Sequence, residues 1–171
     1  RQSQRIVVER DDGECHGVKQ CDLYLEQDRS YQIRLVLRGT VEVVTAELGT
    51  QAWSISGVSE EWKTFETSLT PNKTNSDGVF SVTFTGEGTL WLGAASLMPA
   101  DNIQGYRADV IDAVLDWGPT FLRWPGGNFV SAYHWKDGIG CRDKRPTRLD
   151  PAFGLLEPND VGTDEFIDLC R

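Results

Sequence analysis

One long polar and aromatic segment near the end of the chain contains most of the residues that could do chemistry. It occupies residues 125–162, after an apolar stretch that ends at Trp124 and before a helix predicted to begin near Thr163. Connections after parallel strands usually have only ~2–6 residues. Aromatic rings offer flat apolar faces to the C–H side of a sugar, while Asn, Asp, Arg and His can hydrogen-bond its hydroxyls. This segment therefore predicts a site for a hydroxyl-rich ligand such as a sugar.

Arg123 and Asn128 flank the turn that opens this segment. Gly126-Gly127 is not followed by Lys-Ser or Lys-Thr and lacks the GxGxxG spacing, which argues against a phosphate-binding loop. We interpret the two glycines as a tight turn that lets Asn128 approach the site. Arg123 could instead form a structural salt bridge, but the neighbouring Pro-Gly-Gly-Asn run favours a role in the site.

His134 and Trp135, further along the segment, each have a structural alternative. His134 has no second metal ligand near it in the sequence, so we predict a hydrogen-bonded structural residue and no metal site. Trp135 can stack on a sugar or pack the long connection, and the sequence leaves both roles open.

The acidic residues after position 156 do not form an evident catalytic pair. Asp164 and Glu165 are adjacent in the first turn of the predicted helix, so their side chains diverge. We predict caps and solvated charge there, since the helix dipole favours negative charge at that end. Glu157 and Asp160 lie in a Pro-Asn turn, which indicates structural or helix-capping roles.

A predicted helix and a predicted strand precede this segment, and a second predicted helix follows it. Thr120–Trp124 is short and mostly apolar, as in a buried parallel strand. Gly118-Pro119 ends the helix before it, and Thr163 is a candidate N-cap of the next one. One parallel strand satisfies neither its own backbone groups nor its apolar faces, so residues 99–171 are predicted to be an unfinished α/β domain. The first helix is marked by apolar residues at steps of four, four and three, namely Tyr106, Val110, Val114 and Trp117.

The first part of the chain has a period of two. Tyr31, Ile33, Leu35 and Leu37 alternate with polar residues, as a half-buried strand requires. Similar short runs separated by Gly, Pro, Asn and Asp predict an antiparallel sandwich or jelly roll over residues 1–98. Three tryptophans of this part are predicted to lie in its core rather than to form a sugar platform, namely Trp53, Trp62 and Trp91.

The stretch LRWPGGNFVSAYHWKDGIG, followed by RPTRLD and EPNDVGTDEF, resembles the glycoside hydrolase family 51 α-L-arabinofuranosidases. The resemblance covers about residues 97–171. It implies a (β/α)8 TIM barrel, incomplete here, that removes terminal non-reducing α-L-arabinofuranosyl groups from arabinoxylan and arabinan-type glycans with retention of configuration. The front part, ending in LWLGAASLMPADN, is similar to the galactose-binding-like sandwich inserted in some members of that family.

The resemblance also implies roles for single residues. Arg123 would orient a catalytic carboxylate, and Asn128 would hydrogen-bond sugar hydroxyls. Phe153 falls where the family often has Trp, which keeps an aromatic surface for substrate but removes the indole N–H. Retaining hydrolysis needs two carboxyl groups ~5–5.5 Å apart. The family's acid/base and nucleophilic glutamates fall on later strands, outside these residues, so the chain alone is expected to be inactive. No metal or organic cofactor is implied.

Composition narrows the classes of partner. The chain has 17 Lys+Arg against 26 Asp+Glu, a net charge of −9, which argues against a nucleic-acid partner. Hydrophobic residues make up 39% and charged residues 25%, as in ordinary globular proteins. No run approaches ~18 consecutive apolar residues, so no membrane partner is expected. The expected partner is a polysaccharide or oligosaccharide that contains arabinofuranose, and the oligomeric state stays open.

The cysteines and one glycosylation sequon indicate in which cellular compartment the protein is expected. Cys15 and Cys21 could close a short loop, but the four cysteines form no CxxC pair. Asn72-Lys73-Thr74 is an acceptor sequon in a polar turn, so Asn72 is a predicted glycosylation site. We therefore expect a secreted protein, with a cytoplasmic one as the alternative.

Two other classes of function fit the first part of the chain. A jelly roll can bind glycans through surface aromatics without a carboxylate pair, so a non-catalytic carbohydrate-binding module is the main alternative. A structural spacer that binds nothing is the third.

Overall fold

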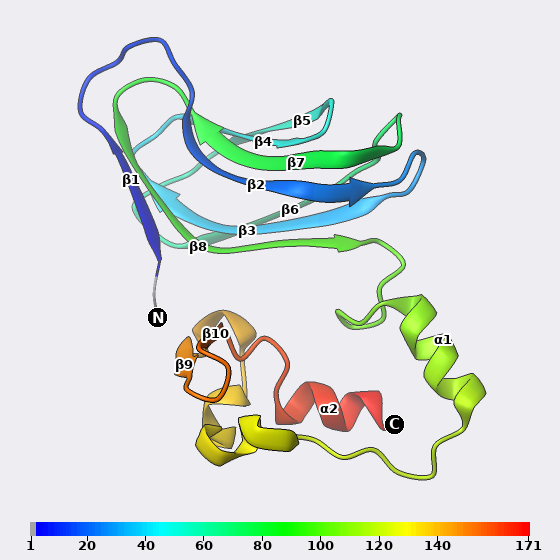
Figure 1. The fold of residues 1–171 in the computed structure, drawn as a ribbon. Helices are drawn as coiled ribbons and strands as arrows, with labels where there is room; N and C mark the ends of the chain where they lie inside the picture. Colours follow the sequence, from blue (N-terminus) through cyan, green and yellow to red (C-terminus); the bar gives the residue numbers. More distant parts are fainter. Residues whose placement is uncertain (1–2) are drawn as a thin grey trace. The chain divides into compact units, whose positions relative to one another are not determined.

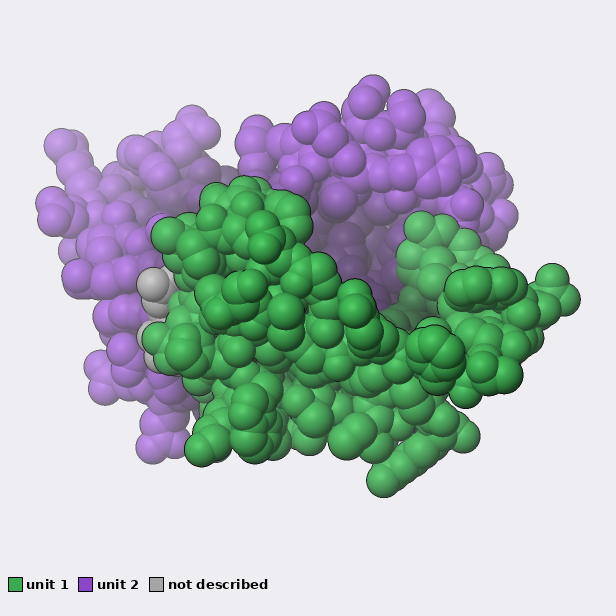
Figure 2. Space-filling model, turned by 60° about the horizontal axis from the view of Figure 1, so that its bottom comes forward, with its two compact units in different colours: residues 1–2, 106–171 green, residues 3–105 purple. Residues whose placement is uncertain are grey.

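A computed structural model describes residues 3–171 of the chain (Figure 1). The described residues form two compact units, 3–105 and 106–171 (Figure 2). The first unit extends beyond residue 98, the predicted end of the sandwich, because the residues that follow are hydrogen-bonded to it. The Ala100 N–H donates to the Ser30 carbonyl oxygen at 2.8 Å, and the Asn102 side chain donates to Gln32 at 3.2 Å.

Residues 3–105 form a sandwich of two four-stranded antiparallel sheets. The strand order is β1-β8-β3-β6 in the first sheet and β2-β7-β4-β5 in the second. The strands of the first sheet are β1 (Gln4–Val8), β3 (Tyr31–Gly39), β6 (Lys63–Leu69) and β8 (Gly88–Pro99). Those of the second are β2 (His16–Leu25), β4 (Val43–Leu48), β5 (Gln51–Ser56) and β7 (Asn75–Phe84). The predicted all-β sandwich is thus confirmed.

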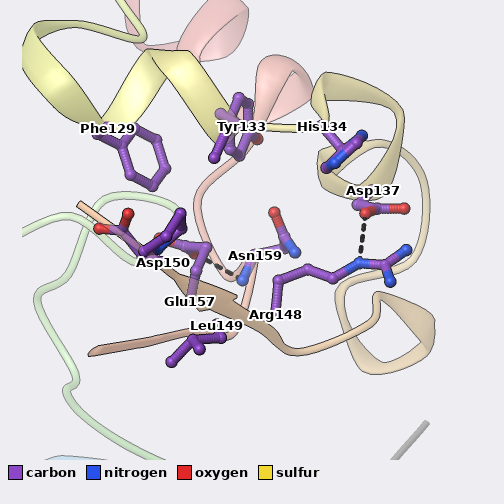
Figure 3. A pocket seen from close by; sticks show the side chains of 11 residues that line it. Phe129, Tyr133, His134, Asp137, Arg148, Leu149, Asp150, Glu157 and Asn159 are labelled. Carbon is purple, nitrogen blue, oxygen red and sulfur yellow. Dashed lines mark hydrogen bonds and ion pairs between the residues drawn. The ribbon is translucent and has the colours of Figure 1, made fainter. Parts of the chain in front are cut away.

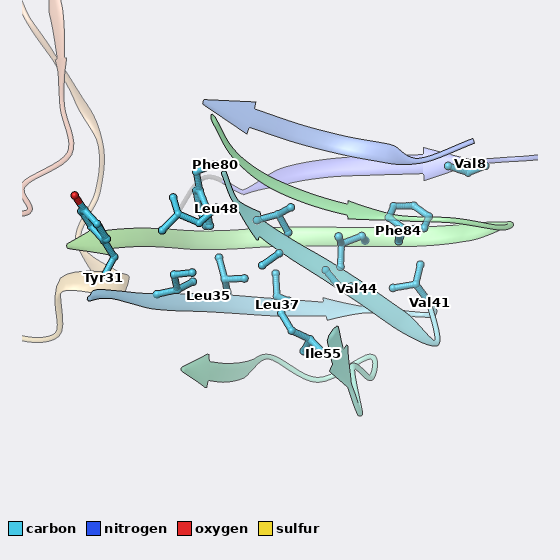
Figure 4. Close-up of a cluster of buried hydrophobic side chains, with 14 of the residues drawn as sticks. Val8, Tyr31, Leu35, Leu37, Val41, Val44, Leu48, Ile55, Phe80 and Phe84 are labelled. Carbon is cyan, nitrogen blue, oxygen red and sulfur yellow. The ribbon is translucent and has the colours of Figure 1, made fainter. Parts of the chain in front are cut away.

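The core of the sandwich is made by alternate residues of the strands, as the period of two predicted. On β3, Ile33, Leu35 and Leu37 are at most 1% exposed. They meet side chains of the second sheet such as Val44 and Leu48 (Figure 4). Since burial of each such side chain contributes roughly 1.5–3 kcal/mol, these strands hold the two sheets together.

The prediction that three tryptophans lie in the core is right for one of them. Trp53 packs against the core cluster. Trp91, in contrast, lies between Leu90 and Leu92, which turn toward the core, so alternation places Trp91 on the outer face of the first sheet. Trp62 precedes β6 and is 41% exposed. Trp62 and Trp91 therefore belong to the surface of the sandwich.

Residues 106–171 contain two short helices and one small hairpin. The predicted first helix is confirmed as α1 (Ala108–Trp117), and it ends at Gly118 in the left-handed conformation. α2 (Thr163–Leu169) begins where predicted, but its N-cap is Gly162 and not Thr163. β9 (Arg148–Asp150) pairs with β10 (Leu155–Glu157) in an antiparallel hairpin. Over the residues described, no helix is long and apolar enough to span a membrane.

The predicted parallel strand at residues 120–124 does not form, and no portion of a TIM barrel is present in residues 3–171. A parallel strand needs at least one neighbouring strand to pair its backbone groups. The one sheet of the second unit is the β9–β10 hairpin, so residues 120–124 have no such neighbour. Phe121 is 81% exposed as a result.

The sandwich core gives a direct test of the fold. Leu35 is fully buried, so Leu35→Ala should lower the free energy of unfolding by ~2–5 kcal/mol in urea denaturation followed by circular dichroism. Leu115→Ala is the matched control, because Leu115 is 71% exposed on α1 and its truncation should cost about 0.5 kcal/mol or less. Equal losses in the two variants would contradict the placement of Leu35 in the core.

Candidate functional site

The segment predicted to carry the site is an irregular chain held by short 3₁₀ helices. These helices are η1 (Gly127–Ala132), η2 (Trp135–Gly138) and η3 (Arg142–Lys144). The β9–β10 hairpin follows, and α2 closes the unit. A segment of this kind has few backbone hydrogen bonds of its own, so side chains must fix its course.

A cluster of aromatic rings holds the start of this segment against α2. Trp124 stacks on Phe166 of α2 with ring centroids 5.6 Å apart, and it meets the edge of Tyr133 at 5.1 Å. Phe129 of η1 lies 4.8 Å from Tyr133 in turn. These contacts fix both ends of the turn that carries Arg123 and Asn128.

Arg123 and Asn128 both lie on the surface of this turn. The Arg123 guanidinium packs over Gly126, where an added Cβ would lie 3.2 Å from Nη2. Gly127 adopts a φ of 63°, which explains the second glycine of the turn. Asn128 is exposed at the start of η1. The turn was predicted, and both polar side chains face solvent.

The two aromatic candidates are also exposed. Trp135 is 54% exposed, and the Lys136 ammonium lies 5.7 Å from the centre of its ring. Phe153 is 64% exposed in the turn between β9 and β10. None of the four predicted residues lines the pocket formed by η1, η2 and the hairpin. Their role in substrate binding stays a prediction.

A small pocket forms between η1, η2 and the β9–β10 hairpin (Figure 3). Asp137 accepts a 2.8 Å hydrogen bond from Arg148 in its wall, which lowers the pKa of Asp137. Glu157 accepts from the Asn159 backbone N–H at 2.7 Å, so Glu157 has the structural role that the sequence predicted. His134 lines the same pocket. For residues 3–171, no group of three His, Cys, Asp or Glu side chains is arranged to hold a metal ion.

Two buried oxygen atoms beside this pocket lack partners in the described chain. The side-chain amide of Asn159 donates to Pro146 at 2.7 Å, while its Oδ1 has no donor among residues 3–171. The Tyr133 hydroxyl is likewise unpartnered there, and an added Cβ at Gly138 would lie 2.3 Å from it. Burial, and then the negative charge of Glu157, raise the pKa of Tyr133. Gly138 is therefore required by packing, which the sequence did not reveal.

A buried ion pair connects the segment to α2. Arg145 is 5% exposed and donates to both carboxylate oxygens of Glu165, at 2.7 and 2.9 Å. Arg145 also donates to the carbonyl oxygens of Gly140 and Asn159, while Arg142 adds a 3.1 Å bond to Glu165. These bonds tie three turns of the segment to one helix.

Glu165 was predicted to cap the helix as a solvated charge, and half of that prediction is wrong. Its carboxylate does cap α2 by accepting the Gly162 N–H at 2.8 Å, but it is only 8% exposed. Burial disfavours the charged form, yet the hydrogen bonds from Arg145, Gly162 and Arg142 outweigh burial and lower the pKa of Glu165 to about 2. A glutamate three residues after the N-cap is a sequence signal for a helix cap. No sequence signal indicates that Arg145 is its buried partner.

The second unit matches known enzymes in sequence. Residues 113–171 match the family model described as the alpha-L-arabinofuranosidase 1 domain. The intracellular exo-alpha-L-arabinofuranosidase of Bacteroides ovatus is 48% identical over 85 residues, which cover 49% of this chain and 16% of that protein. The intracellular exo-alpha-(1->5)-L-arabinofuranosidase of Halalkalibacterium halodurans is 49% identical over 73 residues, covering 43% and 15%. The chain thus spans about a sixth of the length of these curated relatives.

These matches relate the second part of the chain to the glycoside hydrolases. More closely, residues 113–171 are similar to the alpha-L-arabinofuranosidase 1 domain, and the resemblance to family 51 is consistent with that match. The N-terminal cellulose-binding domain of Cellulomonas fimi β-1,4-glucanase C is similar in shape, with a TM-score of 0.42 and 14% identity over 59% of this chain and 80% of that one. A TM-score this low carries no argument about the fold. The sandwich is assigned from the strand pairing of residues 3–105 alone.

The expectation of secretion is wrong. Both relatives just described are named intracellular enzymes. All four cysteines are free thiols, so Cys15 and Cys21 close no loop. Asn72 is exposed. Its predicted glycosylation depended on a secretory compartment, so the correction on secretion removes the reason for that prediction. The error arose because a sequon is a three-residue pattern that occurs often by chance.

The lowered pKa of Glu165 predicts how stability depends on pH. A depressed carboxyl pKa stabilises the fold above the unfolded-state value of about 4.5, and this contribution fades as the pH falls toward about 2. Glu165→Gln should therefore lose about 3 kcal/mol at pH 7 in urea denaturation, with a smaller loss at pH 3. Glu60→Gln, at an exposed position, is the control and should change little at either pH. A pH-independent loss in Glu165→Gln would contradict the proposed charge pairing.

Proposed function

We propose that this chain is part of a retaining α-L-arabinofuranosidase that hydrolyses terminal non-reducing α-L-arabinofuranosyl residues of arabinoxylan or arabinan-type glycans. The observation that carries the proposal is the family match over residues 113–171 together with relatives about half identical in sequence. That match includes the turn with Arg123 and Asn128.

In this proposal, residues 113–171 supply substrate-positioning groups. Asn128 hydrogen-bonds sugar hydroxyls through its exposed amide, and Arg123 orients a carboxylate of the complete site. Trp135 and Phe153 offer apolar ring faces to the C–H side of the sugar. The exposure of all four side chains supports this, because a binding group must be open to its ligand.

The chemistry requires a nucleophilic carboxylate and an acid/base carboxyl group ~5–5.5 Å apart. Glu165 is unsuited to either part, because two arginines and the Gly162 N–H already occupy its oxygen atoms. Glu157 accepts a bond from the Asn159 backbone N–H and supports a turn. We place both catalytic glutamates outside residues 1–171.

This placement predicts that the 171-residue chain alone hydrolyses 4-nitrophenyl α-L-arabinofuranoside no faster than buffer. The measurement is release of nitrophenolate by a purified sample of verified mass. The intact Bacteroides ovatus enzyme serves as the positive control. Turnover by the chain alone would show that its own carboxylates form the catalytic pair.

A chimera tests the positive part of the proposal. Residues 113–171 would replace the corresponding segment of the Bacteroides ovatus enzyme, and the chimera should hydrolyse the same arabinoside. Asn128→Ala in the chimera should then lower kcat/KM by a factor equivalent to ~1–3 kcal/mol of transition-state stabilisation, because one hydrogen bond to the sugar is lost. Ser131→Ala, on the same short helix, is the matched control. A folded chimera whose kcat/KM is unaffected by Asn128→Ala would refute the role of Asn128.

A further inference from the structure

A row of alternating arginines and tryptophans crosses the outer face of the first sheet. Arg5 of β1 and Arg38 of β3 both lie opposite Trp91 of β8 in the strand register. The Arg38 guanidinium carbon lies 4.6 Å from the centre of the Trp91 ring and 5.0 Å from that of Trp62. The Arg5 guanidinium lies 5.4 Å from the Trp91 ring. We call these four residues the arginine–tryptophan row.

The row belongs to the surface and not to the core. Leu37 on β3 and Leu90 on β8 are fully buried, so their neighbours Arg38 and Trp91 point to the opposite face. Arg5 is exposed and Trp62 is 41% exposed. β1, β8 and β3 are neighbours in the sheet (Figure 1), and the register places Arg5, Trp91 and Arg38 one after another across these three strands.

Stacking on an indole leaves a guanidinium able to bind an anion. Cation–π contact uses the flat face of the group, while its N–H donors point outward in the plane and fit a carboxylate through two parallel bonds. No carboxylate among residues 3–171 forms an ion pair with Arg5 or Arg38. Arg38 Nε is buried and has no hydrogen-bond acceptor within that range. Although the chain has a net charge of −9, these two cations on either side of Trp91 are therefore available to an external anion.

We propose that the arginine–tryptophan row binds an acidic polysaccharide, a sugar polymer whose residues carry carboxylates. The carboxylates would pair with Arg5 and Arg38, and the exposed Trp62 ring would pack on the C–H face of a sugar. Arg5 and Arg38 stand two strand spacings apart, about 10 Å, so one carboxylate engages one arginine and a polymer engages both. Nucleic acid fits less well, because phosphate binding needs more cationic groups than this acidic chain gathers here. This site goes beyond the proposed hydrolase function, which concerns residues 113–171.

The test uses the full 171-residue chain and polygalacturonate as the probe, with binding measured by calorimetry at low ionic strength. Fully methyl-esterified polygalacturonate is the matched ligand, because it keeps the sugar faces and removes the charge. We expect the acidic polymer to bind and the ester to bind at least about tenfold more weakly. Added salt should weaken binding, since these groups lie at the surface.

Variants locate the site. Arg38→Gln and Arg5→Gln should each weaken binding about tenfold. Lys19→Gln removes one positive charge from the second sheet and should leave binding unchanged. Urea denaturation checks that each variant is folded. Arg5→Gln decides the matter if Arg38→Gln is unstable, because Arg5 is an exposed residue.

Three results would each overturn the proposal. These are no binding of polygalacturonate by the unaltered chain, equal binding of the ester, and a loss in Lys19→Gln as large as in Arg5→Gln. The outcome is independent of the proposed hydrolase function. The row lies outside the segment exchanged in the chimera, so either experiment can fail without the other.

Discussion

The course of the candidate site depends on one buried ion pair, between Arg145 and Glu165. Taking two charges out of water costs several kcal/mol per ion, and the pair is stable only when its remaining hydrogen-bonding groups are also satisfied. Here they are, because Arg145 donates to two backbone carbonyl oxygens and Glu165 accepts the backbone N–H of Gly162, the N-cap of α2. The pair thus replaces the regular backbone ladder that the segment lacks. The turn with Asn128 is held to the same helix through Trp124 and Phe166.

The two units keep their shape by different means. The sandwich buries a continuous apolar cluster between two hydrogen-bonded sheets, so its stability is distributed over many side chains. The second unit has one short hairpin and relies on rings and charges at a few positions. Several of its large apolar side chains remain exposed, including Trp117, Phe121 and Leu156. Single substitutions in the second unit should therefore have more local effects than those in the sandwich core.

Sequence patterns predicted the parts of the fold that follow a local period. The alternation from Tyr31 to Leu37 identified a strand and its buried face, and the spacing of Val110 and Val114 identified α1. The alternation around Trp91 predicts a strand, but alternation alone does not say which of its two faces is buried. Leu90 is buried and Leu92 packs against the core, so Trp91 between them lies on the outer face. Residues 120–124 had the composition of a parallel strand, but composition does not supply the neighbouring strands that such a strand needs.

The candidate site was predictable only where its residues form a motif. The turn from Arg123 to Asn128 has a recognisable sequence. The partnership of Arg145 with Glu165 does not, because it joins residues 20 apart whose contact depends on the path of the chain between them. Likewise, Gly138 looks like an ordinary turn residue until the Tyr133 hydroxyl is seen against it. Non-local contacts of this kind depend on the folded path of the chain and leave no local sequence pattern.

The free cysteines have a consequence for how the protein maintains its structure. With no disulfide among its four cysteines, the fold contains no covalent bond that a reducing environment could break. The antiparallel ladders and the apolar cluster between them hold the sandwich, and both are indifferent to redox potential. Glutathione at cytosolic concentrations should leave the architecture intact, while the exposed thiols of Cys15, Cys141 and Cys170 stay open to reversible oxidation.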